Sequence, residues 1–224
     1  MSLIKVNSVN KIYNDNGIPV QALKNISLEI NKGDFMVLAG PSGSGKTTLL
    51  NLIGALDFPT SGEIVFNNNN LSKKSKAELS ELRLKKMGFI FQAYNLIPVL
   101  TAAENIEFSL MLLGIPEKER RNRTLNLLDE LGIKNLANKM PNEMSGGQQQ
   151  RVAVARAIIN TPEIVLADEP TANLDSTTGS NLLNLMQKMN EEKNITFIFS
   201  SHDTQVIQRA KKLVVLKDGE IYEN

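Results

Sequence analysis

The chain has 224 residues, and its 25 Lys and Arg residues nearly balance its 24 Asp and Glu residues, which leaves a formal net charge of +1. At roughly 150 residues per domain, this length predicts one large domain, or one domain that carries a small subdomain. The balanced charge gives no reason to expect a nucleic-acid partner, which selects for clustered basic residues. The sequence has no cysteine and a single histidine, His202, which excludes disulfides, thiol catalysis and a His-rich metal site.

The apolar runs of the sequence are short. The run at residues 195–199, for example, falls far below the roughly 18–20 apolar residues that a membrane-spanning helix needs. The N-terminus also lacks the basic stretch and apolar segment of a secretory signal peptide. We therefore expect the chain to stay in the cytosol, and any membrane part of its machinery to be supplied by another chain.

The first third of the chain reads mainly as strands. Alternating residues at 3–6 and 28–30, linked by polar turns, predict antiparallel strands, and the apolar run at 35–39 predicts a strand buried on both faces. A helical run follows at 48–56. Residues 62–66 predict another strand, which ends in an Asn-rich turn at 67–70 because Asn tolerates left-handed backbone.

Strand signals then disappear from about Gln92 to Asn160. Thr101 and Glu104 have the spacing of a capping box that opens a helix, and a second helix starts near Pro116. Apolar strand patterns return at 164–167 and 195–199. This alternation predicts an α/β fold with a helical subdomain inserted into it.

Residues 40–47 carry the strongest local motif. They match G-x-x-x-x-G-K-[S/T], directly after an apolar strand and before a helical run. Glycines let backbone N–H groups converge on phosphate oxygens, and the positive end of the helix dipole favours the anion. In this motif Lys46 reaches the β- and γ-phosphates and the Thr47 hydroxyl binds Mg²⁺.

A second motif ends the apolar strand at 164–167 with two carboxylates, Asp168 and Glu169. Ligands of open α/β sheets bind at the carboxyl ends of the strands, so these acids are expected to face the phosphates. Asp168 suits Mg²⁺, and Glu169 can act as the general base for a water aligned on the γ-phosphate.

The third motif, Ser-Gly-Gly-Gln at residues 145–148, precedes a helical run from about 149 to 159. It is a second anion site of the same physical kind, at a helix N-terminus. One nucleotide has no use for two such sites in one chain. Two chains that face each other head to tail would use both sites, because each chain would place this segment against the γ-phosphate bound to the other chain.

In this order and spacing, the three motifs resemble the ATP-binding cassette (ABC) family over essentially the whole chain. The resemblance implies an α/β P-loop NTPase (RecA-like) core, an N-terminal antiparallel β subdomain and an inserted α-helical subdomain. We expect one domain, in which residues 1–91 and 160–224 form the ATP-binding core and 92–159 the helical part. Two departures, Met144 where Leu is commoner and Ala-Asn-Leu-Asp at 172–175, leave the expected hydrolysis intact.

The resemblance also implies roles for single residues. Gln92 contacts Mg²⁺ and the attacking water, His202 hydrogen-bonds the γ-phosphate, and residues 172–175 cross the dimer interface. Tyr13 stacks on adenine, although an aromatic in this segment can equally serve packing. The expected catalytic residues are Lys46, Gln92, Glu169 and His202, and the expected Mg²⁺ ligands are Thr47, Gln92 and Asp168. The expected ATP contacts are Tyr13, Gly40, Pro41, Ser42, Gly43, Ser44, Gly45, Lys46, Thr47, Thr48, Ser145, Gly146, Gly147 and Gln148.

Other P-loop proteins explain less of the sequence. Residues 31–34 match the guanine-reading N-K-x-D pattern of GTPases, but they lie before the phosphate loop rather than well after it, and are better explained as a turn. A small-molecule kinase would leave residues 145–148, Gln92 and His202 unexplained.

Residues 91–105 and 166–175 further resemble the ATPases of lipoprotein-releasing and macrolide-exporting systems, with the cell-division ATPase a near relative. This resemblance implies a homodimer that closes on two MgATP and drives a separate integral-membrane permease from the cytoplasmic face of the cell membrane. A mechanical ATPase of a membrane complex stays open as the alternative. Soluble cassettes acting on ribosomes or DNA usually carry two cassettes or long coiled coils, which this chain lacks.

Overall fold

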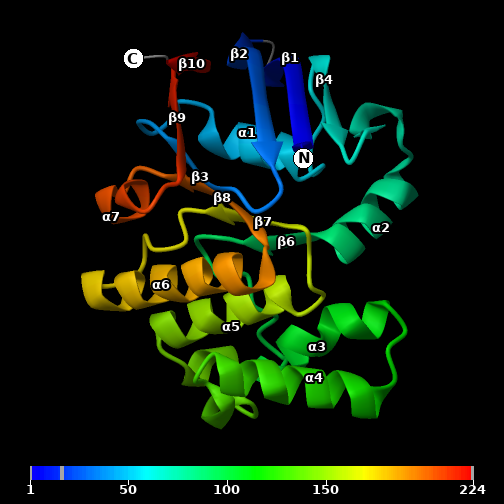
Figure 1. Ribbon diagram of the computed structural model, residues 1–224, viewed down its shortest axis with the longest axis vertical. Coiled ribbons are helices and arrows are strands. Elements are labelled where there is room, and N and C mark those ends of the chain that lie inside the picture. The colour runs from blue at the N-terminus through cyan, green and yellow to red at the C-terminus, as the bar shows by residue number, and fades with distance from the viewer. Residues whose placement is uncertain (1, 16–17, 223–224) are drawn as a thin grey trace.

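The computed structural model describes residues 2–15 and 18–222. The centre of this described part is a six-stranded sheet with the order β10-β9-β3-β8-β7-β6 (Figure 1). Its strands run parallel from β9 to β6, and β10 joins β9 antiparallel. The strands are β3 (Phe35–Ala39), β6 (Met87–Ile90), β7 (Ile164–Asp168), β8 (Thr196–Ser201), β9 (Lys212–Lys217) and β10 (Glu220–Tyr222).

A second, antiparallel sheet has the order β2-β1-β4-β5. It contains β1 (Ser2–Asp15), β2 (Ile18–Asn31), β4 (Ser61–Phe66) and β5 (Asn69–Asn70). The prediction of short strands linked by polar turns is wrong here, because the polar residues between them belong to two long paired strands. Antiparallel strands can face water on one side, so they need apolar residues only at alternate positions.

Helices cover the central sheet and extend away from one end of it. They are α1 (Lys46–Ile53), α2 (Lys76–Lys86), α3 (Ala102–Leu112), α4 (Glu117–Glu130), α5 (Gly146–Ile158), α6 (Ser176–Lys193) and α7 (Thr204–Gln208), with short 3₁₀ turns at Leu71–Lys73, Lys134–Leu136 and Pro141–Glu143. Helices α2, α6 and α7 and strands β9 and β10 carry no pattern from which they were predicted. None of the described helices combines the length and apolar character needed to span a bilayer.

Helix boundaries follow from capping chemistry. The expected capping box of Thr101 and Glu104 is present at the start of α3. Helix α5 starts at Gly146, earlier than the expected residue 149, because Ser145 and Gln148 form a capping box of their own. Helix α1 ends at Ile53 rather than near residue 56, since Ala55 has a φ of 53° and cannot continue a right-handed helix.

The central sheet is buried on both faces, as the apolar run at 35–39 predicts. Phe35 and Val37 belong to one apolar cluster with residues of α3, α4, α5 and α6, whereas Met36 and Leu38 belong to another with α1 and the antiparallel sheet. Figure 1 shows these layers, with α5 and α6 on one side of the sheet and α1 on the other. The parallel strands therefore have fixed positions relative to one another.

The segment between β6 and β7 contains no strand, which confirms the expected loss of strand signals there. Helices α3 and α4 lie at the end of the molecule farthest from the antiparallel sheet (Figure 1). The division into residues 92–159 and a core of 1–91 and 160–224 stays a prediction.

Asn105 provides a test of this helical region. Its buried side chain accepts a hydrogen bond from the Ile97 amide at 2.7 Å and donates to the carbonyls of Ile97, Leu100 and Thr101. Because Asn105→Ala removes these four hydrogen bonds and a fully buried polar side chain, and leaves the partly buried Ile97 amide and Leu100 carbonyl without this partner, we expect it to lower the free energy of unfolding by about 2–4 kcal/mol. Urea denaturation measures the change. The exposed Asn122→Ala on α4 is the control, with an expected effect within about 0.5 kcal/mol.

Candidate functional site

The loop between β3 and α1 has a backbone that only glycine adopts readily. Gly40, Gly43 and Gly45 have φ values of 147°, 78° and 100°. A Cβ atom at Gly40 would also lie 2.1 Å from the carbonyl oxygen of Leu216. The three glycines are therefore required by conformation and, at Gly40, by close packing.

Lys46 is the first residue of α1, and its side chain folds back over the loop. Its ammonium group donates to the carbonyl oxygens of Gly40 at 2.8 Å and Pro41 at 2.9 Å. A cation is thus held beside the N-terminus of a helix, where backbone N–H groups already favour an anion. The buried hydroxyl of Ser44, in the same loop, has no hydrogen-bond partner among the described residues. These features suit a phosphate group.

Strand register brings the second motif to this loop. Ala39 at the end of β3 lies opposite Ser201 of β8, and Asp168 at the end of β7 lies opposite Ser200 of β8. The Thr47 hydroxyl consequently donates to the Asp168 carboxylate, at 3.0 and 3.1 Å from its two oxygens. Two of the three predicted Mg²⁺ ligands, Thr47 and Asp168, are therefore in direct contact.

Glu169 is held in an unusual conformation with a φ of 45°. Its amide donates to the Ser200 carbonyl at 2.9 Å, which fixes the turn after β7. One carboxylate oxygen accepts from the Ser201 hydroxyl at 2.9 Å, and the other lies 2.7 Å from His202 Nδ1. Sequence reasoning missed Ser201, because a serine at a strand end carries no pattern that distinguishes it.

A cavity of about 410 Å³ joins the parts of this site. It is lined by Val20, Gln21, Ala22, Ser42, Gly43, Gly45, Lys46, Thr47, Thr48, Gln92, Glu169, Ala172, Ser200 and His202. Gln92 follows β6 in an exposed loop, and its carbonyl accepts from the Asn173 side chain at 2.9 Å. Four predicted catalytic residues thus border one cavity.

Tyr13 lies beside this cavity without lining it. It is opposite Val20 in the β1–β2 register, and Val20 borders the cavity. The Tyr13 hydroxyl donates to the Asp57 carboxylate at 2.8 Å, while 38% of the residue stays exposed. An aromatic ring with this exposure is available to a ligand.

Residues 145–148 lie elsewhere, around a separate cavity of about 500 Å³ that shares no lining residue with the first. The Ser145 hydroxyl accepts from the Gln148 amide at 3.4 Å, so its own proton is free to be donated. A Cβ atom at Gly146 would lie 2.7 Å from the Tyr94 hydroxyl, and one at Gly147 would lie 2.5 Å from the Thr178 methyl group. One chain therefore does not bring its two anion sites together.

The GTPase-like residues 31–34 form a turn before the amino end of β3. The Asn31 amide donates to the Asp34 carboxylate at 2.8 Å, and the Asp34 amide to the Asn31 carbonyl at 3.1 Å. This turn lies at the edge of the sheet opposite the carboxyl ends that carry the cavity, so its side chains serve the turn. A guanine-reading role is excluded by this position.

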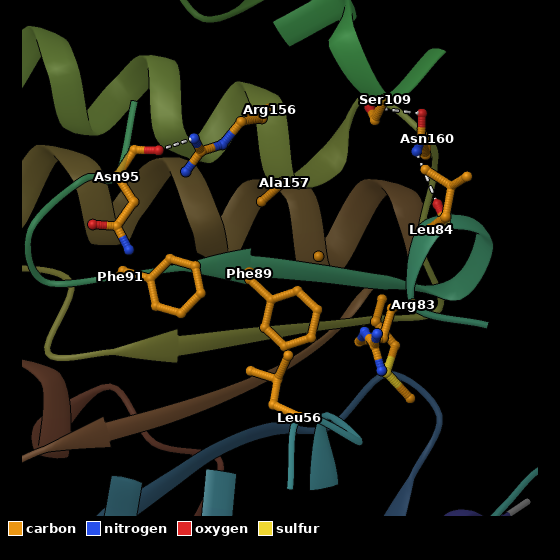
Figure 2. A pocket seen from close by; sticks show the side chains of 12 residues that line it. Leu56, Arg83, Leu84, Phe89, Phe91, Asn95, Ser109, Arg156, Ala157 and Asn160 are labelled. Carbon is orange, nitrogen blue, oxygen red and sulfur yellow. Dashed lines mark hydrogen bonds between the residues drawn. The ribbon is translucent and has the colours of Figure 1, made fainter. Parts of the chain in front are cut away.

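A groove of about 350 Å³ opens beside the loop that follows Gln92 (Figure 2). The aromatic rings of Phe89 and Phe91, and Leu56 below them, supply its apolar wall. On the other side Arg156, a residue of α5, donates to the carbonyl of Asn95 and, at 2.8 Å, to that of Tyr94. Tyr94 and Asn95 both have positive φ values, so Arg156 holds this loop in a strained shape.

The described residues contain no cluster of three or more His, Cys, Asp or Glu side chains placed to hold a metal. A hydroxyl and a carboxylate in contact, as in Thr47 and Asp168, nevertheless fit Mg²⁺. This cation keeps several waters and takes further oxygen ligands from substrate phosphates, so it needs few protein ligands.

Comparisons with known proteins agree with this geometry. Residues 23–172 match the family model described as ABC transporter. The chain is 45% identical to the uncharacterized ABC transporter ATP-binding protein MJ0796 of Methanocaldococcus jannaschii, over 98% of this chain and 95% of the relative. It is 41% identical to the lipoprotein-releasing system ATP-binding protein LolD of Legionella pneumophila, over 95% and 93% of the two chains.

The match to the macrolide export ATP-binding/permease protein MacB of Campylobacter jejuni, at 44% identity, covers 98% of this chain but only 33% of that protein. Among solved structures, the dimeric post-hydrolysis state of the ATP-binding cassette MJ0796 bound to ADP and Pi superposes with a TM-score of 0.92. That structure is 44% identical, with 98% of this chain and 97% of the other covered. The chain therefore belongs to the ABC transporter family, in which it is an ATP-binding cassette that hydrolyses ATP.

Proposed function

We propose that two copies of the chain close head to tail around two ATP molecules and drive a membrane permease. In the closed pair, each γ-phosphate lies between Lys46 of one copy and residues 145–147 of the other. The observation that carries this proposal is the separation of the two anion sites in one chain, each with its own cavity. The dimeric structure of the MJ0796 cassette bound to ADP and Pi supports it.

Within each site, residue roles follow from the contacts. The phosphates replace the Gly40 and Pro41 carbonyls as partners of Lys46, whose charge then stabilises the phosphoryl group in the transition state. Thr47, Asp168 and Gln92 hold Mg²⁺, which neutralises phosphate charge when it is bound. Glu169 accepts a proton from the attacking water as the oxygen bonds to the γ-phosphorus and the bond to ADP breaks.

The Glu169–His202 contact connects proton transfer to phosphate binding. His202 Nδ1 faces Glu169 at 2.7 Å, which leaves Nε2 to face the γ-phosphate. A neutral imidazole donates from only one nitrogen. The tautomer that carries its proton on Nε2 donates to the phosphate, and its unprotonated Nδ1 can accept a hydrogen bond from Glu169 only after Glu169 has taken the proton from water. His202 thus senses whether the general base has acted.

The groove beside the Gln92 loop is the proposed site for a permease helix. It would dock near residues 94–100 and α3, where Val99, Phe108, Met111 and Leu112 expose apolar side chains. Exposed apolar residues that gather beside a groove are typical of interaction surfaces. Arg156 ties α5 to the loop at Tyr94 and Asn95 (Figure 2), so closure of residues 92–159 onto the ATP-binding core would move a permease helix docked beside this loop.

The permease is proposed to be of the lipoprotein-releasing or macrolide-exporting type, with the cassette on the cytoplasmic face of the cell membrane. Support comes from the relatives named for these systems, at 41% and 44% identity. The chain spans about a third of the macrolide relative, which is an ATP-binding/permease protein.

Glu169→Gln tests the closed pair. The amide keeps the shape of the side chain but cannot accept the water proton, so we expect turnover to fall by about 10²–10⁴-fold while ATP still binds. Steady-state phosphate release measures the turnover. Light scattering with MgATP is expected to give twice the monomer mass for this variant. Monomer alone, with ATP bound, would contradict the head-to-tail arrangement.

Met111→Glu in the Glu169→Gln background tests the docking surface. A charge on the exposed face of α3 disfavours an apolar contact, so we expect loss of the permease during affinity capture from detergent-solubilised membranes with ATP. Dimerisation is expected to persist. The control is Asn122→Asp on α4. Equal recovery of a multi-spanning permease with both variants would place docking elsewhere, and a division protein as main partner would favour a mechanical role.

Tyr13→Ala tests the base contact. Loss of a stacking ring is expected to weaken ATP binding by about 1–3 kcal/mol, the usual contribution of a base–aromatic stack. Calorimetric titration of ATP measures the affinity, with the exposed Tyr222→Ala on β10 as control. Unchanged affinity in both variants would return Tyr13 to a packing role.

A further inference from the structure

Tyr13 is anchored by two charged residues that lie outside the cavity. Asp57 accepts three hydrogen bonds, from the Tyr13 hydroxyl at 2.8 Å, from the Lys11 ammonium at 2.8 Å and from the Phe58 amide at 2.7 Å. Lys11 also donates to the Phe58 carbonyl at 2.8 Å. We call Lys11, Tyr13 and Asp57 the tyrosine clamp. Its members come from β1 and from the loop after α1, so the clamp bridges two separate segments of the fold.

The clamp is better shielded than an ordinary surface ion pair. The side chain of Lys11 is 11% exposed and that of Asp57 is 32% exposed. Burial alone would raise the pKa of Asp57, but the hydrogen bonds from Lys11, Tyr13 and the Phe58 amide, with the Lys11 charge, hold this pKa below its ordinary value. Asp57 is therefore an ionised acceptor at neutral pH, and hydrogen bonds to charged groups are the stronger kind.

Tyr13 stays a donor under the same conditions. Burial raises the pKa of the Tyr13 phenol, and the hydrogen bond to Asp57 and its negative charge raise this pKa further, while the nearby Thr48 side chain acts in the opposite sense. Thr48 itself lines the cavity. The hydroxyl end of the ring is thus held by Asp57, close to the residue that follows the phosphate loop.

Lys11 also occupies one face of the ring. Its ammonium nitrogen lies over the Tyr13 ring, 4.6 Å from the ring centre, within the range of a cation–π contact. Lys11 and Tyr13 are two residues apart on β1, so they project from the same face of the strand. A stacking partner must therefore take the opposite face of the ring.

The clamp is tied to the phosphate loop through α1. Residues 40–47 lead into the N-terminus of this helix, and Asp57 follows its C-terminus. An eight-residue helix is a rigid spacer, so the distance between the phosphate loop and the ring is fixed before any ligand binds. This arrangement lowers the entropic cost of ordering the ring when a nucleotide binds.

We propose that Asp57 is a positioning residue for nucleotide binding, which with Lys11 fixes the Tyr13 ring so that its open face meets the base. This inference rests on the proposed stacking role of Tyr13. Asp57 touches no part of the nucleotide and acts only through Tyr13. The clamp should consequently strengthen the binding of ligands that carry a base and leave the affinity for a phosphate chain without a base unchanged.

Calorimetric titration of two probes tests this inference. MgATP carries the base, and magnesium tripolyphosphate carries only the phosphates. Asp57→Ala is expected to raise the Kd for MgATP roughly threefold to tenfold, as for the loss of one charge-assisted hydrogen bond, and to leave the Kd for tripolyphosphate within about twofold. Asp57→Asn, which keeps the shape of the side chain, is expected to act in the same direction if the alanine variant folds poorly. The control is the exposed Asp129→Ala on α4.

A double variant separates positioning from general damage. In the Tyr13→Ala background, Asp57→Ala is expected to cause no further loss of MgATP affinity, because the residue that it positions is gone. The inference is overturned if the effects of the two substitutions on MgATP affinity add, or if Asp57→Ala weakens tripolyphosphate binding as much as MgATP binding. It is also overturned if Asp57→Ala leaves the MgATP affinity unchanged while Tyr13→Ala lowers it. If Tyr13→Ala itself leaves the MgATP affinity unchanged, the proposed stacking role of Tyr13 is wrong, and this inference is wrong with it.

Discussion

The register of three neighbouring parallel strands determines everything else in the proposed ATP site. Ala39 of β3 lies opposite Ser201 of β8, and Asp168 of β7 lies opposite Ser200 of β8. The loops that follow these strands therefore begin side by side at the same edge of the sheet. A shift of one residue in β7 would turn its side chains to the other face and separate Asp168 from Thr47. Parallel strands keep this register because both faces of the sheet are buried, one by α3, α4, α5 and α6 and the other by α1 and the antiparallel sheet, which explains why an ATPase site needs so large an apolar core.

Within that frame, the site relies on groups that are oriented before the nucleotide arrives. The glycine-rich backbone, the folded-back Lys46 and the left-handed Glu169 are all fixed by contacts inside the chain. Preorganised dipoles and charges of this kind cost little reorganisation during the reaction, so they stabilise a transition state well. The Ser145 segment is the exception, since it is equally well formed but lines a cavity separate from the one that Lys46 and Glu169 border.

The sequence allowed prediction of those features that local chemistry decides. The bounds of β3 and the capping box of α3 follow from short apolar and polar patterns, and both are confirmed. The long strands β1 and β2 could not be recognised, because half-exposed antiparallel strands contain many polar residues. The contact of Ser201 with Glu169 and that of Tyr13 with Asp57, 44 residues away, exist only after tertiary packing. The roles of Gln92 and His202 came from family resemblance rather than from any pattern around them.

The contact between Gly146 and Tyr94 has a consequence for how the two halves of a closed pair communicate. The glycine leaves room for the Tyr94 hydroxyl, and Arg156, from the same helix, holds the Tyr94 and Asn95 carbonyls. In a head-to-tail pair, the start of α5 would face the partner's ATP while the loop at Tyr94 follows Gln92 beside the chain's own ATP. Helix α5 and the loop at Tyr94, held together by these contacts, would then contact both nucleotides. Occupancy of one site would bias the other, and ATP hydrolysis would depend on nucleotide concentration in a sigmoidal manner.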